Sequence, residues 1–316
     1  MRQKYLDHAK GLAIFLVIWM HCIQYLHKES FENSIYAIVY TFHMPLFLII
    51  SGYLFYSSLT RPSMTVIKNK SLRLIVPNVL WGGILALLLG DYSPSVVFTS
   101  FWFLNTLFIG LCLYLLINKF IGIPYSILVL SLGVLLLPGL QFIKFSIPFI
   151  GIGLWIKKLN IIDKIKDAPL VLVAMMLIIL FFYINVWDKS WYIYITSAPK
   201  FFNSDIHAWI AYFARIFYGS ITSLFILAML KLFEDKCGRV VDKLLCALSS
   251  NSLGLYVMHM FILILISDYV SIFLEDISST SLQNTLISFC ISGLFTYLIL
   301  QMVNLFKRHS ILKYLC

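Results

Sequence analysis

Asp7, Lys10 and His21 are ionisable side chains in the first apolar stretch of the chain, which runs from Tyr5 to Tyr25. Asp7 and Lys10 lie at its start, and His21 follows Lys10 after ten intervening residues. An ionisable group inside a membrane-length apolar run is costly, so it indicates a functional site unless a partner accounts for it. Eleven helical residues at about 100° each return to within roughly 20° of one face, so Lys10 and His21 can line one channel.

Three more ionisable residues, His43, Arg215 and His259, lie inside later apolar runs. At about 1.5 Å per helical residue, these three and His21 all fall roughly 12–15 Å from a membrane boundary, near the middle of the bilayer. We therefore expect a polar cavity in a helix bundle. Packing alternatives stay open, because His43 or His259 can simply hydrogen-bond a neighbouring helix. Arg215 keeps its charge and can face water, a ligand phosphate or a carbonyl-rich pocket.

The composition defines the class of protein that must position these residues. The chain has 316 residues, of which 61% are hydrophobic and 12% charged, and its mean hydropathy is +0.91. This is too apolar for a soluble core and predicts a polytopic membrane protein. The first run is expected to be a transmembrane helix rather than a cleaved signal peptide. The six cysteines are scattered without histidines at ligand spacing, so neither a disulfide framework nor a metal site is predicted.

Apolar runs long enough to cross about 30 Å of hydrocarbon predict an all-α fold of about ten transmembrane helices. A single membrane domain is expected to fill residues 1–316. The short run at 145–157 contains Pro148 and two glycines, and is expected to be tilted, broken or partly re-entrant. The predicted helices span residues 11–27, 35–57, 74–90, 101–118, 123–141, 145–157, 168–187, 207–231, 250–268 and 283–306.

Basic residues predict the orientation. With the N-terminus and the C-terminus in the cytoplasm, nearly all loop Lys and Arg fall on the inner side, as the positive-inside rule requires. The net charge of +10 is then a topology signal, with no nucleic-acid partner expected, and it leaves an inner face able to hold an anion. The outer loops are expected to hold only Lys28, Lys144, Lys189 and Lys200.

Short motifs occur in one order along the chain. Asp7-His8-Ala9-Lys10-Gly11 precedes His21 in the first run. The later motifs are Phe42-His43-Met44-Pro45-Leu46-Phe47, Ser51-Gly52-Tyr53, Arg73 with Pro77, Trp102-Phe103-Leu104, and Ser252-Leu253-Gly254-Leu255-Tyr256 with His259. Over nearly the whole chain this series resembles acyltransferase family 3, the integral-membrane O- and N-acyltransferases that include surface-polysaccharide O-acetyltransferases. Two departures are that Lys10 stands where Arg is commoner, and that the chain stops soon after its tenth run, without the outer hydrolase-like domain of some members.

The resemblance implies transfer of an acyl group, usually acetyl, from cytoplasmic acyl-CoA to a hydroxyl or amine of a sugar or polysaccharide. His21 is then expected to act as general base or as an acyl relay, and Lys10 and Asp7 are the other catalytic candidates. Acyl-CoA is a co-substrate, so no permanently bound cofactor is expected. The candidates for binding its phosphates are Lys10, Arg73, Lys68, Lys70 and Arg215.

The acceptor side is expected to draw on other residues of the same motifs. His43 and His259 could orient the acceptor or polarise the thioester carbonyl, and Tyr256 or Arg215 could stabilise an oxyanion. Trp102 and Asn105, near the outer boundary, are candidates for sugar binding, although aromatic residues there are usually interface anchors.

A secondary transporter is the main alternative, because it would also carry mid-membrane polar residues on broken helices. It would be expected to show inverted repeats, which the sequence does not contain. The expected location is the plasma membrane, a bacterial inner membrane by analogy with the family, with the lipid bilayer as an obligatory partner.

Overall fold

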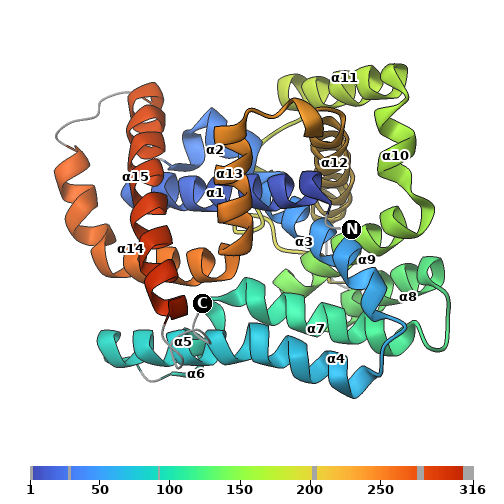
Figure 1. The fold of residues 1–316 in the computed structure, drawn as a ribbon, viewed down its shortest axis with the longest axis horizontal. Helices are drawn as coiled ribbons and strands as arrows, with labels where there is room; N and C mark the ends of the chain where they lie inside the picture. Colours follow the sequence, from blue (N-terminus) through green and yellow to red (C-terminus); the bar gives the residue numbers. More distant parts are fainter. Residues whose placement is uncertain (1–2, 28–29, 92, 201–204, 276–280, 309–316) are drawn as a thin grey trace. The chain divides into compact units, whose positions relative to one another are not determined.

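The computed structural model of the chain describes residues 3–27, 30–91, 93–200, 205–275 and 281–308 (Figure 1). Within these ranges the regular structure is helical and no strand occurs, which confirms the all-α class. Each of the ten apolar runs is largely helical, although the run at 35–57 is divided between two helices; in hydrocarbon a backbone must satisfy its own hydrogen bonds within the segment. Lys28, expected in an outer loop, lies outside the described residues, as do Arg2 and Lys313, which are expected on the inner side.

The helices fall into two compact units that are not continuous in sequence, each described by itself. The first four residues of α7 (Trp102–Ile117) belong to unit 1 and the remainder to unit 2. Unit 1 otherwise contains α1 (Lys4–Leu26), η1 (Ser30–Glu32), α2 (Ser34–Tyr40), η3 (Ser71–Ile75), α5 (Val76–Leu89), α6 (Pro94–Thr99), α13 (Arg239–Ser250), α14 (Ser252–Glu275) and α15 (Ser281–Arg308). Unit 2 contains α3 (His43–Phe55), η2 (Tyr56–Ser58), α4 (Ser63–Lys70), α8 (Ile123–Leu136), α9 (Gln141–Leu159), α10 (Ile161–Lys166), α11 (Pro169–Asn185), η4 (Lys189–Trp191), α12 (Ile206–Leu232) and η5 (Glu234–Lys236).

Fewer than ten of these helices are long and apolar enough to cross a membrane unaided. Among the described residues five spans qualify, or six if α13 and α14 count as one span bent by 74°. The helices at 102–117, 123–136 and 169–185 are apolar but shorter. A membrane protein is therefore confirmed, whereas the count of ten is not. The five spans are Lys4–Leu26, Ser34–Ser58, Ser63–Leu89, Ile206–Leu232 and Leu282–Arg308.

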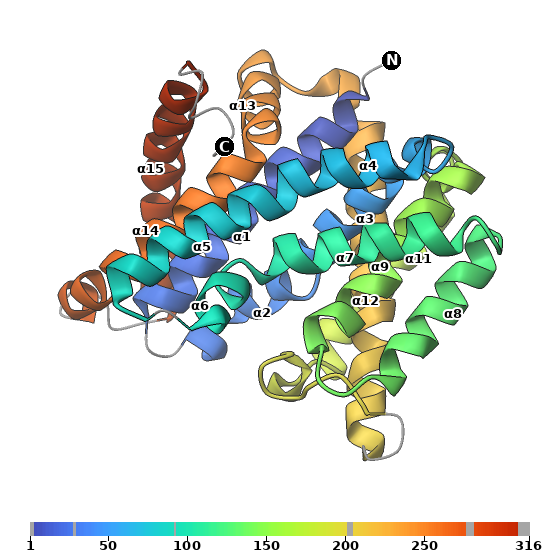
Figure 2. The ribbon, with the colours of Figure 1, turned by 90° about the horizontal axis from the view of Figure 1, so that it is seen from below.

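Helix α1 is the centre of unit 1, where it packs against α13, α14 and α15 (Figures 1 and 2). Most of its side chains are buried, including the polar His8. The approach of α13 is close at Gly11, where an added Cβ would lie 2.2 Å from the carbonyl oxygen of Leu245. Only glycine fits there without moving a backbone. On another side of the unit, α14 packs against α5, with the rings of Trp81 and Phe261 5.0 Å apart.

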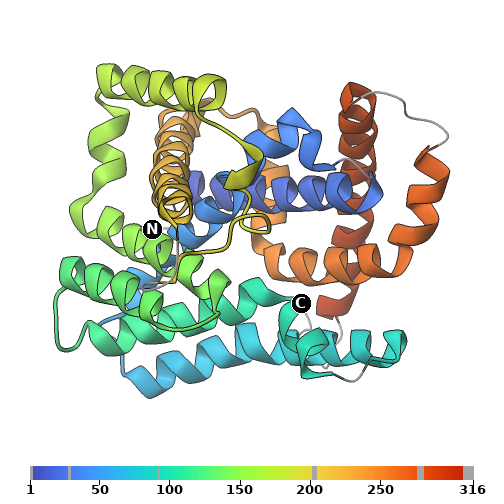
Figure 3. The same cartoon turned by 180° about the vertical axis from the view of Figure 1, so that it is seen from behind.

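In unit 2, α3 and α9 pack backbone to backbone, because Gly52 and Gly153 each face a carbonyl of the partner helix. Figure 3 shows α12 beside α11, which it contacts. The second apolar run is interrupted at Thr41 and Phe42, just before Pro45. Proline has no N–H to donate to the carbonyl four residues earlier, so an interruption here follows from the sequence.

The run at 145–157 is not broken, because α9 continues through Pro148; its tilt in the membrane stays a prediction. Pro148 cannot donate to the carbonyl of Lys144, but the hydroxyl of Tyr212 does so at 3.0 Å. A proline is tolerated inside a membrane helix when a neighbouring helix supplies the missing donor. Lys144, expected in an outer loop, instead lies buried in the first turn of α9, where its ammonium donates to the carbonyl of Pro199 at 3.1 Å.

The contact at Gly11 gives a stability prediction. Gly11→Ala should destabilise the protein by about 1–3 kcal/mol, because the added methyl overpacks a backbone contact that cannot yield locally. Thermal unfolding of the detergent-solubilised protein, followed by size-exclusion chromatography, measures the change. The matched control is Gly83→Ala in α5, where nothing lies within 4 Å of the added Cβ. A helix gains from that replacement. Equal melting temperatures for the two variants would contradict the packing described here.

Candidate functional site

His21 and His259 meet between α1 and α14. The Nδ1 atom of His21 lies 2.9 Å from the Nε2 atom of His259, and the two ring planes are within 15° of parallel. His259 is completely buried, whereas His21 is only partly so. The two side chains therefore meet at one level, although they stand 238 residues apart in the chain; their depth in the bilayer stays a prediction.

The hydrogen-bond partners determine which nitrogen carries each proton. The Nδ1 atom of His259 lies 2.8 Å from the carbonyl oxygen of Leu255, one helical turn earlier. A carbonyl only accepts, so Nδ1 of His259 is the donor and, in the neutral ring, Nε2 presents a lone pair. His21 must then donate from its own Nδ1, which leaves Nε2 of neutral His21 unprotonated. This is the form of a histidine that is ready to take a proton.

Aromatic rings surround the histidine pair within unit 1. The ring of Tyr256 lies 5.7 Å from that of His259 and also contacts Phe103 at 5.5 Å and Phe101 at 6.4 Å. The ring of Tyr25 lies 6.1 Å from that of His21, one turn along α1. Most of these rings are buried. They reduce the access of water to the pair, which strengthens electrostatic interactions there.

A cluster of charges lies at the beginning of α1. Lys10 is within electrostatic range of Asp7, Arg73 and Lys307, so three cations share the region with one carboxylate. Arg73 is exposed on η3, a π-helical turn, which is a feature frequent at functional sites. The net positive charge of the cluster suits an anionic ligand.

The junction of α13 and α14 is fastened to this cluster by two hydrogen-bonding side chains. The hydroxyl of Ser249 donates to Asp7 at 3.0 Å. The ammonium of Lys307, on α15, donates to the side-chain oxygen of Asn251 at 2.6 Å and to the carbonyl of Ser250 at 3.1 Å. These bonds hold the bend next to Lys10. The sequence reasoning did not single out Lys307, Ser249 or Asn251 for the site; Lys307 carried one signal, its place at the inner end of the last apolar run.

Trp102 and Asn105 lie in the first turn of α7, in unit 1. Asn105 accepts a hydrogen bond from the buried Asn78 at 2.7 Å and donates to the carbonyl of Phe98 at 2.8 Å. Asn105 thus ties α5 and α6 to the start of α7. The ring of Trp102 is partly exposed and contacts Phe103 at 6.2 Å. Their part in acceptor binding stays a prediction.

Four candidates belong to unit 2, and their part in the site also stays a prediction: His43, Lys68, Lys70 and Arg215. His43 is buried at the start of α3. Lys68 and Lys70 lie on α4 rather than in a loop. The ammonium of Lys70 stands 5.3 Å from the centre of the Phe55 ring.

Arg215 binds a set of backbone carbonyls in unit 2. Its guanidinium donates to the carbonyl of Trp191 at 2.6 Å and to that of Thr196 at 2.6 Å, and further to those of Ser190 and Tyr192. The carbonyl-rich pocket named among the alternatives therefore exists. These bonds fix the irregular segment between α11 and α12, since a planar fork can serve several acceptors at once.

Comparison with known proteins identifies the family. The sequence pattern of acyltransferase family 3, described as an acyltransferase domain, matches residues 3–303. The chain therefore belongs to this family, as the motifs predicted. It is also 29% identical over 171 residues to nodulation protein NolL of Mesorhizobium japonicum, and 30% identical over 173 residues to nodulation protein NolL of Sinorhizobium fredii.

Both alignments cover 46% of this chain and 46% of the relative, so the chain matches about half the length of these curated relatives. No solved structure matches the chain.

Proposed function

We propose that this protein transfers an acyl group, acetyl foremost, from cytoplasmic acyl-CoA to a hydroxyl or amine of a sugar or polysaccharide. Family membership supports acyl transfer as the reaction class. The single observation that carries the catalytic assignment is the hydrogen-bonded chain from Leu255 through His259 to His21. It provides a general base whose tautomer is fixed.

In the reaction, Nε2 of His21 takes the proton of the acceptor hydroxyl while its oxygen attacks the thioester carbonyl carbon. The new C–O bond gives a tetrahedral oxyanion, which collapses with cleavage of the C–S bond. The departing CoA thiolate then receives the proton from Nε2. His259 is a positioning residue in this scheme, because its Nε2 accepts the Nδ1 proton of His21 and holds the ring in one orientation.

Donor binding is assigned to the charge cluster at the start of α1. Lys10, Arg73 and Lys307 would hold the phosphates of CoA, and Asp7 would keep the Lys10 ammonium in place. Lys10 and His21 stand about 16 Å apart along α1 and share nearly one face. A phosphate at Lys10 and a thioester at His21 can thus be joined by an extended pantetheine arm.

Acceptor binding is assigned to Trp102 and Asn105, with Tyr256 as the candidate oxyanion stabiliser. The proposed location is the bacterial plasma membrane, with both termini in the cytoplasm, because cytoplasmic acyl-CoA must reach the cations of the inner side. The distribution of Lys and Arg supports this orientation.

The catalytic assignment predicts a graded series of variants. In purified protein supplied with acetyl-CoA and candidate sugars one at a time, His21→Ala should lower the rate of thiol release by about 10²–10⁴-fold. His259→Leu should cost about 10²-fold by releasing the ring of His21. His259→Gln should retain more activity, because its amide oxygen can accept the Nδ1 proton.

The matched control for this series is His207→Gln, an exposed histidine at the start of α12. It should behave as wild type. Acetyl-CoA turnover unchanged by His21→Ala would overturn the assignment, as would a wild-type protein that moves a solute across vesicles without consuming acetyl-CoA. A covalent acetyl-His21 intermediate would replace direct transfer by an acyl relay.

If the cation cluster at the start of α1 binds the phosphates of acyl-CoA, removing one of its cations should weaken recognition of those phosphates. Wild type should prefer acetyl-CoA over acetyl-pantetheine, which lacks the nucleotide phosphates, in kcat/KM. Lys10→Ala and Arg73→Ala should each reduce this preference at least tenfold, mainly through KM for acetyl-CoA. Lys119→Ala, which removes a basic residue outside the cluster, should keep the preference. An unchanged preference in both Lys10→Ala and Arg73→Ala would place the phosphates elsewhere.

A further inference from the structure

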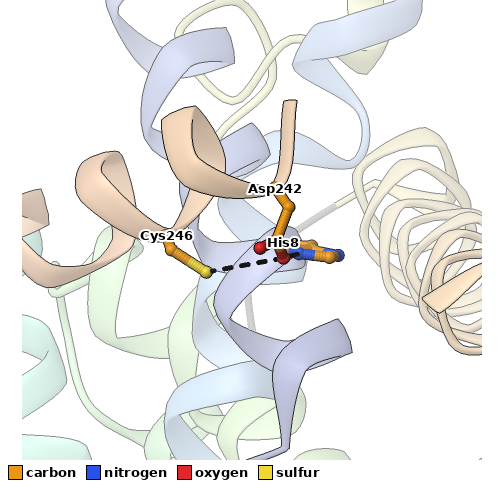
Figure 4. Close-up of side chains that lie close together, drawn as sticks. All are labelled: His8, Asp242 and Cys246. Carbon is orange, nitrogen blue, oxygen red and sulfur yellow. Dashed lines mark hydrogen bonds and ion pairs between the residues drawn. The ribbon is translucent and has the colours of Figure 1, made fainter. Parts of the chain in front are cut away.

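A second group of chemically active side chains lies between α1 and α13, apart from the histidine pair. His8, Asp242 and Cys246 point toward one another there (Figure 4). Nε2 of His8 lies 2.7 Å from Oδ1 of Asp242, and the sulfur of Cys246 lies 4.0 Å from the same oxygen. All three ligand atoms are within 4.8 Å of one another.

The two helices position these atoms for a shared ligand. Asp242 and Cys246 stand four residues apart on α13, so they lie on one face, and that face meets α1. The close approach at Gly11, three residues after His8, brings the backbones near enough for short side chains to converge. The sequence alone indicated no metal site, because His8 lies 234 residues from Asp242 and no local spacing links them.

We propose that His8, Asp242 and Cys246 form a binding site for Zn²⁺. Imidazole, carboxylate and thiolate are the three ligand types that zinc accepts, and three protein ligands leave a fourth position for water. Without a metal, the ion pair between His8 and Asp242 already explains why those two side chains lie together. The thiol of Cys246, which is not in a disulfide, completes a ligand set that the ion pair does not require.

The distances are close to those of a tetrahedral site. Metal–ligand bonds of about 2.0–2.3 Å place the ligand atoms of such a site about 3.3–3.6 Å apart. The separations of 2.7 Å and 4.0 Å from Oδ1 of Asp242 fall on either side of that range, and Nε2 of His8 and the sulfur of Cys246 are within 4.8 Å, so side-chain rotations are needed to centre an ion. Binding would release the thiol proton to solvent and move the imidazole proton to Nδ1 of His8.

The site is open to solvent on the side of Asp242 and enclosed in low-dielectric surroundings on the side of His8. The side chain of His8 is 2% exposed, whereas that of Asp242 is 33% exposed. An ion can therefore enter beside Asp242 and keep a water ligand there. Bound zinc would clip α13 to the start of α1 through Asp242, about two turns before the bond between Ser249 and Asp7 on the same face of α13.

The test is metal binding by the purified full-length protein in detergent, with no need for catalysis. After treatment with chelator and incubation with Zn²⁺ alone, wild type should retain one zinc per chain. Cys246→Ser and Asp242→Asn should lower the affinity at least tenfold. Cys290→Ser, which changes an exposed cysteine on α15, should bind as wild type does.

Replacement of Zn²⁺ by Co²⁺ gives a signature that a purely structural ion pair would not produce. Wild type should show a thiolate-to-cobalt charge-transfer band, and Cys246→Ser should lack it. The proposal is overturned if wild type binds no more zinc than Cys246→Ser, or if the cobalt spectrum of wild type shows no thiolate band. Because the second criterion uses wild type alone, it holds even where a variant fails to fold.

Discussion

The hydrogen bond between His21 and His259 is the interaction on which the proposed chemistry depends. Two neutral imidazoles in an apolar bundle would each be costly to bury without a partner. Here one ring satisfies the other, and the carbonyl of Leu255 fixes the direction of the whole chain. Neutral His259 differs from a carboxylate in the same position, because it orients the ring of His21 without adding a negative charge. The bond between the two rings therefore fixes the tautomer of His21 and does little to stabilise a positively charged His21 ring.

The hydrogen bond between His21 and His259 requires α1 to be held rigidly. In unit 1, close helix packing and side-chain hydrogen bonds hold it. Gly11 lets α13 approach α1, while Ser249 and Lys307 fasten the bend between α13 and α14 to the start of α1 and to α15. The same helix thus carries a cation cluster at one end and the histidine pair about three turns further along. A single rigid helix can relate donor binding to the position of the reacting thioester.

The sequence predicted those features that follow from local physical rules. The all-α class, the helix at each apolar run and the shared depth of His21 and His259 follow from hydropathy and helical rise, and the family follows from ordered motifs. Helix α13 was not predicted, because Arg239 and Lys243 make it resemble a basic inner loop, and it is too short and polar for a membrane run. The partners of Lys144 and of His8 were also not predicted, since both depend on segments distant in the chain. The continuous helix through Pro148 depends on a donor from α12 that no local pattern reveals.

The most direct test of the central claim is the protonation of the His21 ring, measured by nitrogen-15 NMR of the histidine-labelled protein near neutral pH. The His21→Gln spectrum assigns the signals. The account predicts that His21 is protonated at Nδ1 and unprotonated at Nε2, with the Nδ1 proton in a hydrogen bond that disappears in His259→Leu. A His21 ring protonated at Nε2 and unprotonated at Nδ1 would contradict it, because that tautomer has no lone pair at Nε2 to take the proton of the acceptor hydroxyl.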